Sequence, residues 1–312
     1  MQITGPVREV LSWYDGERPG VKANLVRMLM HGVTGGSGRL LILPVDQGFE
    51  HGPAASFAAN PAGYDPRYHF ELAIAAGVSA LAAPLGFLTM GADRYAGAVP
   101  LILKANSANG LGSIKDEAIT ATVRDALELG CSAIGYTIYP GSDRQYEMFE
   151  EVRAGAAEAR ALGLAVVIWA YPRGGSLSHE GETAVDVVAY GAQIAAQLGA
   201  HIIKVKPPAD RIETAQARLA CEAAHCDLST LEKRVAHVLE AAFDGRRLVV
   251  FSGGPAKDID AVLAEITAIA GGGGHGSIVG RNTFQRPREE ALTMLGRIAA
   301  IHLGAAKAKP AP

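Results

Sequence analysis

Short apolar runs alternate with helix-length amphipathic stretches along the chain, and this alternation constrains the fold more than any other feature of the sequence. Strands that are buried on both faces and joined by helices pair in parallel, and eight of them close into a barrel more readily than they form an open sheet. The sequence therefore predicts an α/β fold, a (β/α)8 TIM barrel. The eight apolar runs, each ending in polar residues or glycine, are 40–45, 80–84, 101–104, 133–137, 165–170, 201–206, 248–252 and 277–280.

The stretches between the runs have the length and pattern of helices. Four of them end shortly before the next run at Gly77, Gly130, Gly163 and Gly199, which fit left-handed helix caps. The alternative fold is a doubly wound open sheet, but it is expected to show the pattern G-x-G-x-x-G after its first strand, and the pattern is absent there. The predicted helices include 68–76, 115–129, 144–162, 183–198, 231–243 and 258–268.

One barrel domain with an extension at each end is expected. At 312 residues the chain is long for a single small domain, yet barrels of this kind commonly reach roughly 250 residues or more as one unit. We assign residues 1–38 to an N-terminal helical arm across the bottom of the barrel, 39–303 to the barrel itself, and 304–312 to a flexible tail rich in Ala, Lys and Pro.

Charge and cysteine content narrow the class of ligand. The 29 Lys and Arg residues nearly balance the 32 Asp and Glu residues, giving a formal net charge of -3, so we expect a small-molecule ligand and no nucleic-acid or membrane partner. Cys131, Cys221 and Cys226 are too few for a disulfide framework, and no apolar segment has the length of a signal core or a membrane span. A cytoplasmic location is expected.

Lys204 and Lys206, on the sixth apolar run, are the most informative pair, because barrel active sites form where the strands end. The two-residue period of a strand points both lysines to one side and Ile203 and Val205 to the other. A desolvated amine beside a second cation has a lowered pKa, and the neutral amine is the form that attacks a ketone to give an imine. We predict Lys204 as the nucleophile and Lys206 as its cationic neighbour or a phosphate ligand. The alternative, two exposed lysines at a strand end, is disfavoured by their apolar neighbours.

Glycine-rich turns follow the seventh and eighth runs and predict phosphate binding. Backbone N–H groups in such turns can approach an anion closely, and an arginine adds positive charge. Each motif alone is more typical of an ordinary turn, but barrels of this kind often bind phosphate after the last two strands. The candidate residues are Ser252, Gly253, Gly254, Gly280 and Arg281.

Two further strand ends carry candidates for proton transfer and substrate contact. Trp169 and Tyr171 lie two residues apart at the end of the fifth run, so their side chains face the same way. The phenol can exchange a proton with a substrate hydroxyl and the indole can pack against its carbon chain, although an aromatic pair by itself more often packs in a core. Asp46 ends the first run, where its carboxylate could shuttle protons during imine formation or cap a turn.

A metal site is disfavoured. Cys221, His225 and Cys226 lie close together in the sequence, but they lack the C-x-x-C spacing of a structural zinc site. The other histidines form no helical H-x-x-x-H pair. We therefore expect neither a metal ion nor another cofactor.

With these residues in place, the sequence resembles the archaeal-type class I fructose-bisphosphate aldolases, a group that is also found in bacteria and is distinct from the animal class I enzymes. The resemblance covers nearly the whole chain, and four matching motifs in order are hard to obtain by chance. The motifs are Asp46-Gln47-Gly48-Phe49-Glu50-His51-Gly52-Pro53, Trp169-Ala170-Tyr171-Pro172-Arg173-Gly174, Gly199-Ala200-His201-Ile202-Ile203-Lys204-Val205-Lys206 and Ser252-Gly253-Gly254.

The resemblance implies a metal-independent lyase of glycolysis and gluconeogenesis that interconverts fructose 1,6-bisphosphate with dihydroxyacetone phosphate and glyceraldehyde 3-phosphate. It implies that Lys204 forms the Schiff base, that Tyr171 is the general acid/base and that Asp46 is the family's aspartate on the first strand. Family members are often ring-built decamers, so a homo-oligomer is expected. The family's tryptophan and phosphate loops correspond to Trp169, Ser252, Gly253, Gly254, Gly280 and Arg281.

Two other functions stay open from the sequence. A related Schiff-base aldolase, transaldolase-type enzyme or thiolase acting on another phosphorylated ketose would keep Lys204, and cleavage assays on several ketose phosphates would separate it. A non-catalytic phosphate-binding protein or scaffold would keep the fold, because fold does not dictate function. It would bind sugar phosphates in a titration but form no covalent adduct.

Overall fold

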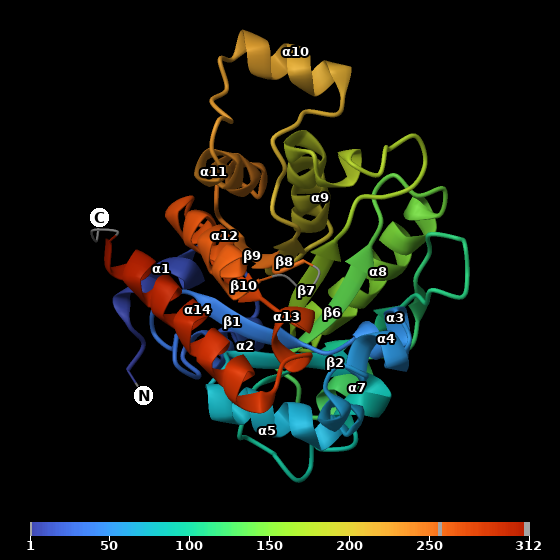
Figure 1. Cartoon of the computed structure of the whole chain (residues 1–312), viewed down its shortest axis with the longest axis vertical. Coiled ribbons are helices and arrows are strands. Elements are labelled where there is room, and N and C mark those ends of the chain that lie inside the picture. Colours follow the sequence, from blue (N-terminus) through green and yellow to red (C-terminus); the bar gives the residue numbers. More distant parts are fainter. Residues whose placement is uncertain (1, 255–257, 309–312) are drawn as a thin grey trace.

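Eight parallel strands close into a barrel in the computed structural model, which describes residues 2–254 and 258–308 (Figure 1). In space they follow the order β1-β10-β9-β8-β7-β6-β3-β2. The predicted TIM barrel is confirmed, and each predicted strand is present to within two residues at either end. The strands are β1 Leu40–Pro44, β2 Ala80–Pro84, β3 Leu101–Lys104, β6 Ala133–Ile138, β7 Ala165–Ala170, β8 Ile202–Val205, β9 Leu248–Ser252 and β10 Gly276–Ile278.

Helices surround the barrel, and the larger ones lie outside the strands in Figure 1. The four predicted glycine caps are confirmed, because Gly77, Gly130, Gly163 and Gly199 all have positive φ. The helices are α1 Gly5–Ser12, α2 Pro19–Leu29, α3 Gln47–Glu50, α4 Pro53–Phe57, α5 Pro66–Ala76, α6 Leu85–Leu88, α7 Val123–Glu128, α8 Gln145–Ala161, α9 Val185–Gln197, α10 Ala215–Ala223, α11 Leu231–Ala241, α12 Ile259–Gly271, α13 Arg281–Phe284 and α14 Arg288–Ala308, with 3-10 turns η1 Pro61–Tyr64 and η2 Gly181–Thr183.

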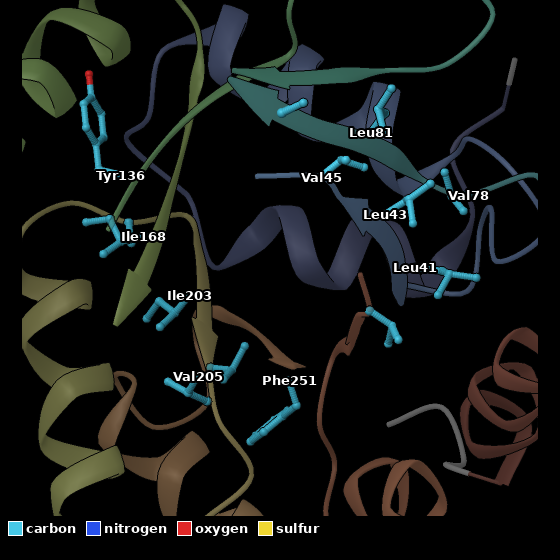
Figure 2. Close-up of a cluster of buried hydrophobic side chains, with 14 of the residues drawn as sticks. Leu41, Leu43, Val45, Val78, Leu81, Tyr136, Ile168, Ile203, Val205 and Phe251 are labelled. Carbon is cyan, nitrogen blue, oxygen red and sulfur yellow. The ribbon is translucent and has the colours of Figure 1, made fainter. Parts of the chain in front are cut away.

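The hydrophobic core has two layers that follow the two-residue period of the strands. Residues such as Leu41, Ile203 and Phe251 point outward and pack against the helices, and Figure 2 draws part of this outer layer. Their neighbours in sequence, such as Ile202 and Val250, point inward and fill the barrel. Because the inner positions are apolar up to the last residues of the strands, a polar side chain at a strand end is placed at the mouth of a closed interior.

The N-terminal helices α1 and α2 pack against the inner layer at the end of the barrel where the strands begin. The Tyr14 hydroxyl donates to the His201 carbonyl oxygen at 2.5 Å and accepts from the Leu248 amide at 3.0 Å, so it links the starts of β8 and β9. At the other terminus α14 runs to Ala308, and residues 309–312 of the predicted tail lie outside the described residues. The division of the chain at residues 38 and 303 stays a prediction.

The predicted helix at 115–129 is wrong in its first half. The helix α7 begins only after Thr122, whose side chain and that of Asp125 form a capping box. Before it, β5 (Ala118–Ile119) pairs antiparallel with β4 (Asn106–Ser107). The charged residue Glu117 is 5% exposed because it turns inward to pair with a lysine of the barrel, and this tertiary contact overrides the local helical pattern.

None of the helices in the described part of the chain is both long enough and apolar enough to cross a membrane.

A partly buried ion pair between Glu17 and Arg160 lies at the end of the barrel where the strands begin, and it gives a test of the fold. The Glu17 carboxylate lies between α1 and α2 and accepts from Arg160 Nη2 at 2.6 Å and Nε at 3.1 Å. It also lies 3.6 Å from Nε2 of His201, whose Nδ1 accepts from the Val166 amide. These contacts, led by the one to His201, lower the pKa of Glu17 from 4.5 to about 2.

Glu17→Gln is expected to lower the free energy of unfolding near neutral pH by roughly 1.5–3 kcal/mol, the usual contribution of hydrogen bonds to charged groups. A carboxylate whose pKa is lower in the folded state stabilises above its unfolded pKa of 4.5, and that contribution is lost as the pH falls toward about 2. Urea unfolding at several pH values measures the difference. Asp15→Asn, which removes an exposed ion pair with Lys22, is the control and should change stability by less than about 1 kcal/mol. A Glu17→Gln deficit that does not shrink in acid would contradict the assignment.

Candidate active site

Lys204 lies in β8 with its side chain directed into the barrel. Its neighbours Ile203 and Val205 belong to the outer layer, so the alternation of the strand turns Lys204 inward. The residue is only 4% exposed, and its Nζ atom lies 5.6 Å from the centre of the Trp169 ring and 5.3 Å from that of Tyr171. This burial excludes the alternative of an exposed lysine at the strand end.

Trp169 lies beneath the mouth of the barrel rather than in its wall. It pairs in register with Lys204 across β7 and β8, is 1% exposed and belongs to the inner core layer. It is not among the described residues that line the cavity at the mouth. The indole is therefore placed to support Lys204 from below, and its predicted contact with the substrate's carbon chain has no direct support from this geometry.

Gly135 in β6 makes room for that indole. A Cβ atom at this position would lie 2.7 Å from Trp169 Cη2 and closer still to Cζ3. Gly135→Ala is therefore expected to push the ring out of place, to destabilise the protein by roughly 1–3 kcal/mol as overpacked cores do, and to lower kcat/KM by disturbing the support of Lys204. Chemical denaturation and steady-state kinetics test this.

The matched control is Gly86→Ala, because a Cβ there has no atom within 4 Å among the described residues. Unchanged kinetics of Gly135→Ala at a temperature where the variant is fully folded would show that the ring position does not matter for catalysis.

A cavity of about 650 Å³ opens above Lys204, where the strands end. It brings together most of the side chains that the sequence singles out, from five different strand ends. The predicted site residues that line it are Asp46, Tyr171, Lys204, Lys206, Ser252, Gly253, Gly254, Gly280 and Arg281.

The electrostatics of this cavity favour a neutral amine and a protonated phenol. Burial lowers the pKa of Lys204 to about 8, against the opposing effect of the Asp46 and Glu50 carboxylates. Burial raises the pKa of Tyr171 well above its usual range, and the same two carboxylates raise it further. Asp46 also has one buried carboxylate oxygen, Oδ1, without a hydrogen-bond partner among the described residues. The three groups can therefore exchange protons with a ligand bound between them.

The two glycine-rich turns form one wall of the cavity and are tied together. The side-chain amide of Asn282 donates to the carbonyl oxygens of Gly253 at 2.9 Å and Gly254 at 3.3 Å. Gly280 has no room for a side chain, since a Cβ atom there would lie 2.8 Å from the Pro44 carbonyl oxygen. The turns after β9 and β10 are thus held as a single cradle of backbone groups, the arrangement that anion sites use.

Lys206 lies at the edge of the cavity and is already paired. Its Nζ atom is 3.3 Å from Oε2 of Glu182, in the 3-10 turn η2, and its side chain is 32% exposed. The cations that lower the pKa of Lys204 are instead Lys104 and Arg281. The second cation predicted beside the nucleophile is therefore best assigned to Lys104, and the role of Lys206 as a phosphate ligand stays a prediction.

Comparison with known proteins places this site in a family. Residues 40–286 match the sequence model of the DeoC/LacD family aldolases. The chain belongs to the DeoC/LacD aldolase family. It is 36% identical over 296 residues to the probable class 1 fructose-bisphosphate aldolase of Chlamydia muridarum, covering 91% of this chain and 84% of the relative. It is 35% identical to the class 1 fructose-bisphosphate aldolase of Thermoproteus tenax, with 86% and 92% covered.

A solved structure extends the comparison to three dimensions. It is an archaeal fructose-1,6-bisphosphate aldolase with its catalytic lysine covalently bound to the carbinolamine intermediate of the substrate. The TM-score is 0.73 at 34% sequence identity, and the match covers 86% of this chain and 95% of the other. The resemblance to the archaeal-type class I aldolases that the motifs indicate is thereby confirmed.

This DeoC/LacD aldolase also contains a buried polar network at the mouth that sequence reasoning missed. The Lys104 ammonium, at the end of β3, donates to Oδ1 of Asn106 at 2.9 Å and lies 3.4 Å from Oε2 of Glu117. Oε1 of Glu117 accepts from the Tyr139 hydroxyl. Arg173 lies over the Tyr139 ring at 4.4 Å. The network fixes the Lys104 ammonium 6.0 Å from the centre of the Trp169 ring.

Across residues 2–254 and 258–308, no three or more His, Cys, Asp or Glu side chains are grouped so that they could hold a metal ion.

Proposed function

We propose that this chain is a class I fructose-1,6-bisphosphate aldolase that forms a Schiff base on Lys204 and reversibly yields dihydroxyacetone phosphate and glyceraldehyde 3-phosphate. The observation that carries the proposal is a lysine amine, buried at the mouth of the barrel, with a pKa lowered to about 8 and with Asp46 and Tyr171 on the same cavity. The names of the relatives and the covalent lysine adduct of the archaeal structure support the same reaction.

Substrate binding begins with the phosphate groups. The cradle of Ser252, Gly253 and Gly254, together with Gly280 and Arg281, offers backbone N–H groups and a guanidinium to one phosphate. Lys206 stands at the cavity edge and is assigned to the substrate as well, with its partner Glu182 holding the ammonium in position. Holding the ketose by its phosphate would direct the C2 carbonyl toward Lys204, and such positioning supplies much of a catalytic rate.

Imine formation needs both a base and an acid. The neutral Lys204 amine attacks C2 of the ketose, and Asp46 takes a proton from the new ammonium and returns it to the C2 oxygen, giving the neutral carbinolamine. The raised pKa of Tyr171 keeps its phenol protonated, so it can then donate a proton to the departing hydroxyl. Water leaves, and the products are the protonated imine and a tyrosinate.

Carbon–carbon cleavage follows from this proton balance. The strongly basic Tyr171 phenolate takes the proton of the C4 hydroxyl, C4 becomes an aldehyde, and the electron pair of the C3–C4 bond moves into the protonated imine. The imine thus serves as the electron sink. The Tyr171 phenol then protonates the remaining enamine at C3. Water hydrolyses the protonated imine, which releases the ketone product, restores the neutral Lys204 amine and returns one proton to the Tyr171 phenolate.

The proposal is tested by borohydride trapping. The protein is incubated with dihydroxyacetone phosphate, reduced with borohydride, digested and mapped by mass spectrometry. A reduced adduct on Lys204 alone is expected. An adduct on Lys104 or Lys206, or the absence of any adduct in a protein that binds the ligand, would contradict the Schiff-base assignment, and the second result would favour a non-catalytic binding protein. Cleavage rates on several phosphorylated ketoses separate the fructose 1,6-bisphosphate reaction from that of a related Schiff-base enzyme.

The pH dependence of kcat/KM should follow the deprotonation of the Lys204 amine. Imine formation needs neutral Lys204, so the rate is expected to rise with pH and to level off above a midpoint near 8. Because the positive charge of Lys104 lowers this pKa, Lys104→Met combined with Glu117→Gln should move the midpoint to higher pH without leaving a buried carboxylate unpaired. Lys22→Met, on α2 at the far end of the barrel, is the control. A midpoint that stays fixed in the double variant would show that Lys104 does not tune the nucleophile.

We also assign the reaction to glycolysis and gluconeogenesis in the cytoplasm, with small sugar phosphates as ligands and without nucleic-acid or membrane partners. The homo-oligomer suggested by the family resemblance, with a decamer as one form, belongs to the same proposal, and sedimentation or light scattering measures it.

A further inference from the structure

A helix on the segment between β8 and α11 places two thiols side by side. The helix α10 has no buried residue, and in Figure 1 it projects away from the barrel. It ends in a Schellman motif: the amide of Cys226 donates to the carbonyl oxygen of Cys221 at 2.9 Å, and the amide of His225 donates to that of Glu222 at 3.2 Å. His225 has the left-handed conformation that this cap requires, with φ of 53°.

This cap determines which side chains meet. In a Schellman motif the residue three positions before the end of the helix contacts the second residue after it, and these positions are Cys221 and Cys226. Partial burial, and after it the neighbouring Cys226 thiol, raise the pKa of Cys221 to about 11, which agrees with a contact between the two side chains. A disulfide needs Cα atoms about 4.4–6.8 Å apart. The backbone hydrogen bond of 2.9 Å from the Cys226 amide to the Cys221 carbonyl oxygen limits the separation of the two Cα atoms to about 6.8 Å at most, given standard bond lengths.

We propose that Cys221 and Cys226 are a reversible dithiol site, which hydrogen peroxide or another hydroperoxide converts into an intramolecular disulfide. The inference does not depend on the aldolase reaction. Proteins of reducing compartments use disulfides of this kind as transient redox switches rather than as structural bridges. Here the bond would lock the final turn of a helix that no buried side chain holds in place.

The exposure of the two thiols sets the order of the chemical steps. Cys226 is exposed and Cys221 is partly buried, so the Cys226 thiolate attacks one peroxide oxygen, breaking the O–O bond and giving a sulfenic acid and water. The Cys221 thiolate then attacks the Cys226 sulfur and expels hydroxide, which takes up a proton to form the second water. Overall two thiols and one peroxide give one disulfide and two waters, and a thiol reductant reverses the change.

Cys131 provides an internal control. It is 3% exposed, and burial raises the pKa of its thiol to about 12. A buried thiol that stays protonated is a poor nucleophile, so Cys131 should remain reduced under conditions that oxidise the pair on α10.

The test treats the full chain with a stoichiometric excess of hydrogen peroxide, quenches with an alkylating agent in denaturant so that every remaining thiol is reached, and maps the peptides by mass spectrometry. We expect a mass loss of about 2 Da in a peptide that contains both Cys221 and Cys226, reversal by dithiothreitol, and full alkylation of Cys131. Cys221→Ser should stop the reaction at the sulfenic or sulfinic acid of Cys226. A disulfide between two copies of the chain, or oxidation of Cys226 to the sulfinic acid in the unsubstituted protein, would overturn the proposal.

Two substitutions at His225 test whether the geometry of the helix cap brings the Cys221 and Cys226 thiols together. Glycine adopts the left-handed conformation freely, so His225→Gly should form the disulfide at least as fast as the unsubstituted chain. A β-branched residue is strongly disfavoured there, so His225→Val should slow disulfide formation by roughly tenfold. Both changes lie on an exposed segment of a helix without buried residues, and circular dichroism checks that each variant is folded. Equal rates for the two variants would show that the Schellman cap does not bring the thiols together.

Discussion

Lys204→Ala is expected to lower the rate of fructose 1,6-bisphosphate cleavage on the order of 10⁴-fold or more, because loss of a covalent nucleophile leaves only the contribution of binding. The variant should also give no adduct on borohydride reduction. The fold should survive, since Lys204 makes no hydrogen bond or ion pair described in the structure, and its described contacts are those of the Nζ atom with the Trp169 and Tyr171 rings. Initial rates, adduct mapping and thermal unfolding measure the three effects.

The controls for this prediction separate the loss of the nucleophile from the loss of a charge. Lys204→Arg keeps a positive charge in the same place but cannot form the imine, so it should be as inactive as the alanine variant. Lys206→Met removes the other lysine of β8 and should weaken substrate binding while leaving the adduct on Lys204. Residual turnover in Lys204→Ala together with an adduct on Lys104, whose Nζ atom also faces the Trp169 ring, would move the Schiff base to β3.

The barrel and its nucleophile could be predicted from the sequence because both depend on local pattern. Each strand is a largely apolar run of three to six residues, and glycines such as Gly77 and Gly199 mark the helix ends before the strands. The period of two along a strand is enough to turn Lys204 inward when Ile203 and Val205 face the helices. The position of a residue at the end of a barrel strand then places it at the mouth.

The buried pair of Lys104 and Glu117 could not be predicted from local sequence pattern. Glu117 follows Lys115 and Asp116, and such a cluster of charges is typical of an exposed helix start. Its burial depends on an ammonium that is 13 positions away in sequence and on the antiparallel pairing of β4 with β5. One signal was available: Lys104 is the last residue of the apolar strand β3, and lysines are almost never fully buried unless they are paired.

The depth of Trp169 in the barrel also could not be predicted from the local sequence pattern. The two-residue spacing to Tyr171 correctly puts both on the inner side of β7, yet it does not say how deep each side chain lies. The depth of Trp169 depends on Gly135 on the neighbouring strand, because a Cβ atom there would collide with the indole. An absent side chain on another strand leaves no pattern next to Trp169 in the sequence.

The second large effect is expected from Tyr171→Phe. This change removes only the phenolic oxygen, so cleavage of fructose 1,6-bisphosphate should slow by about 10²–10⁴-fold, the usual contribution of a general acid/base. Imine formation with dihydroxyacetone phosphate should persist at a reduced rate, because Asp46 remains to move protons on the carbinolamine. Borohydride trapping should therefore still label Lys204, and single-turnover kinetics should show the adduct forming before carbon–carbon cleavage.

Comparing Lys204→Ala with Tyr171→Phe tests which of the two side chains is needed for imine formation and which for carbon–carbon cleavage. A Tyr171 phenol with a raised pKa gives a proton to the departing water and, as a phenolate, takes one from the C4 hydroxyl, so its loss should affect cleavage more than adduct formation. Trp169→Phe, which keeps an aromatic ring below Lys204 and leaves the phenol in place, is the matched control for a purely structural effect. If Tyr171→Phe abolished trapping as completely as Lys204→Ala does, the phenol would be indispensable for imine formation, and Asp46 could not complete the loss of water without it.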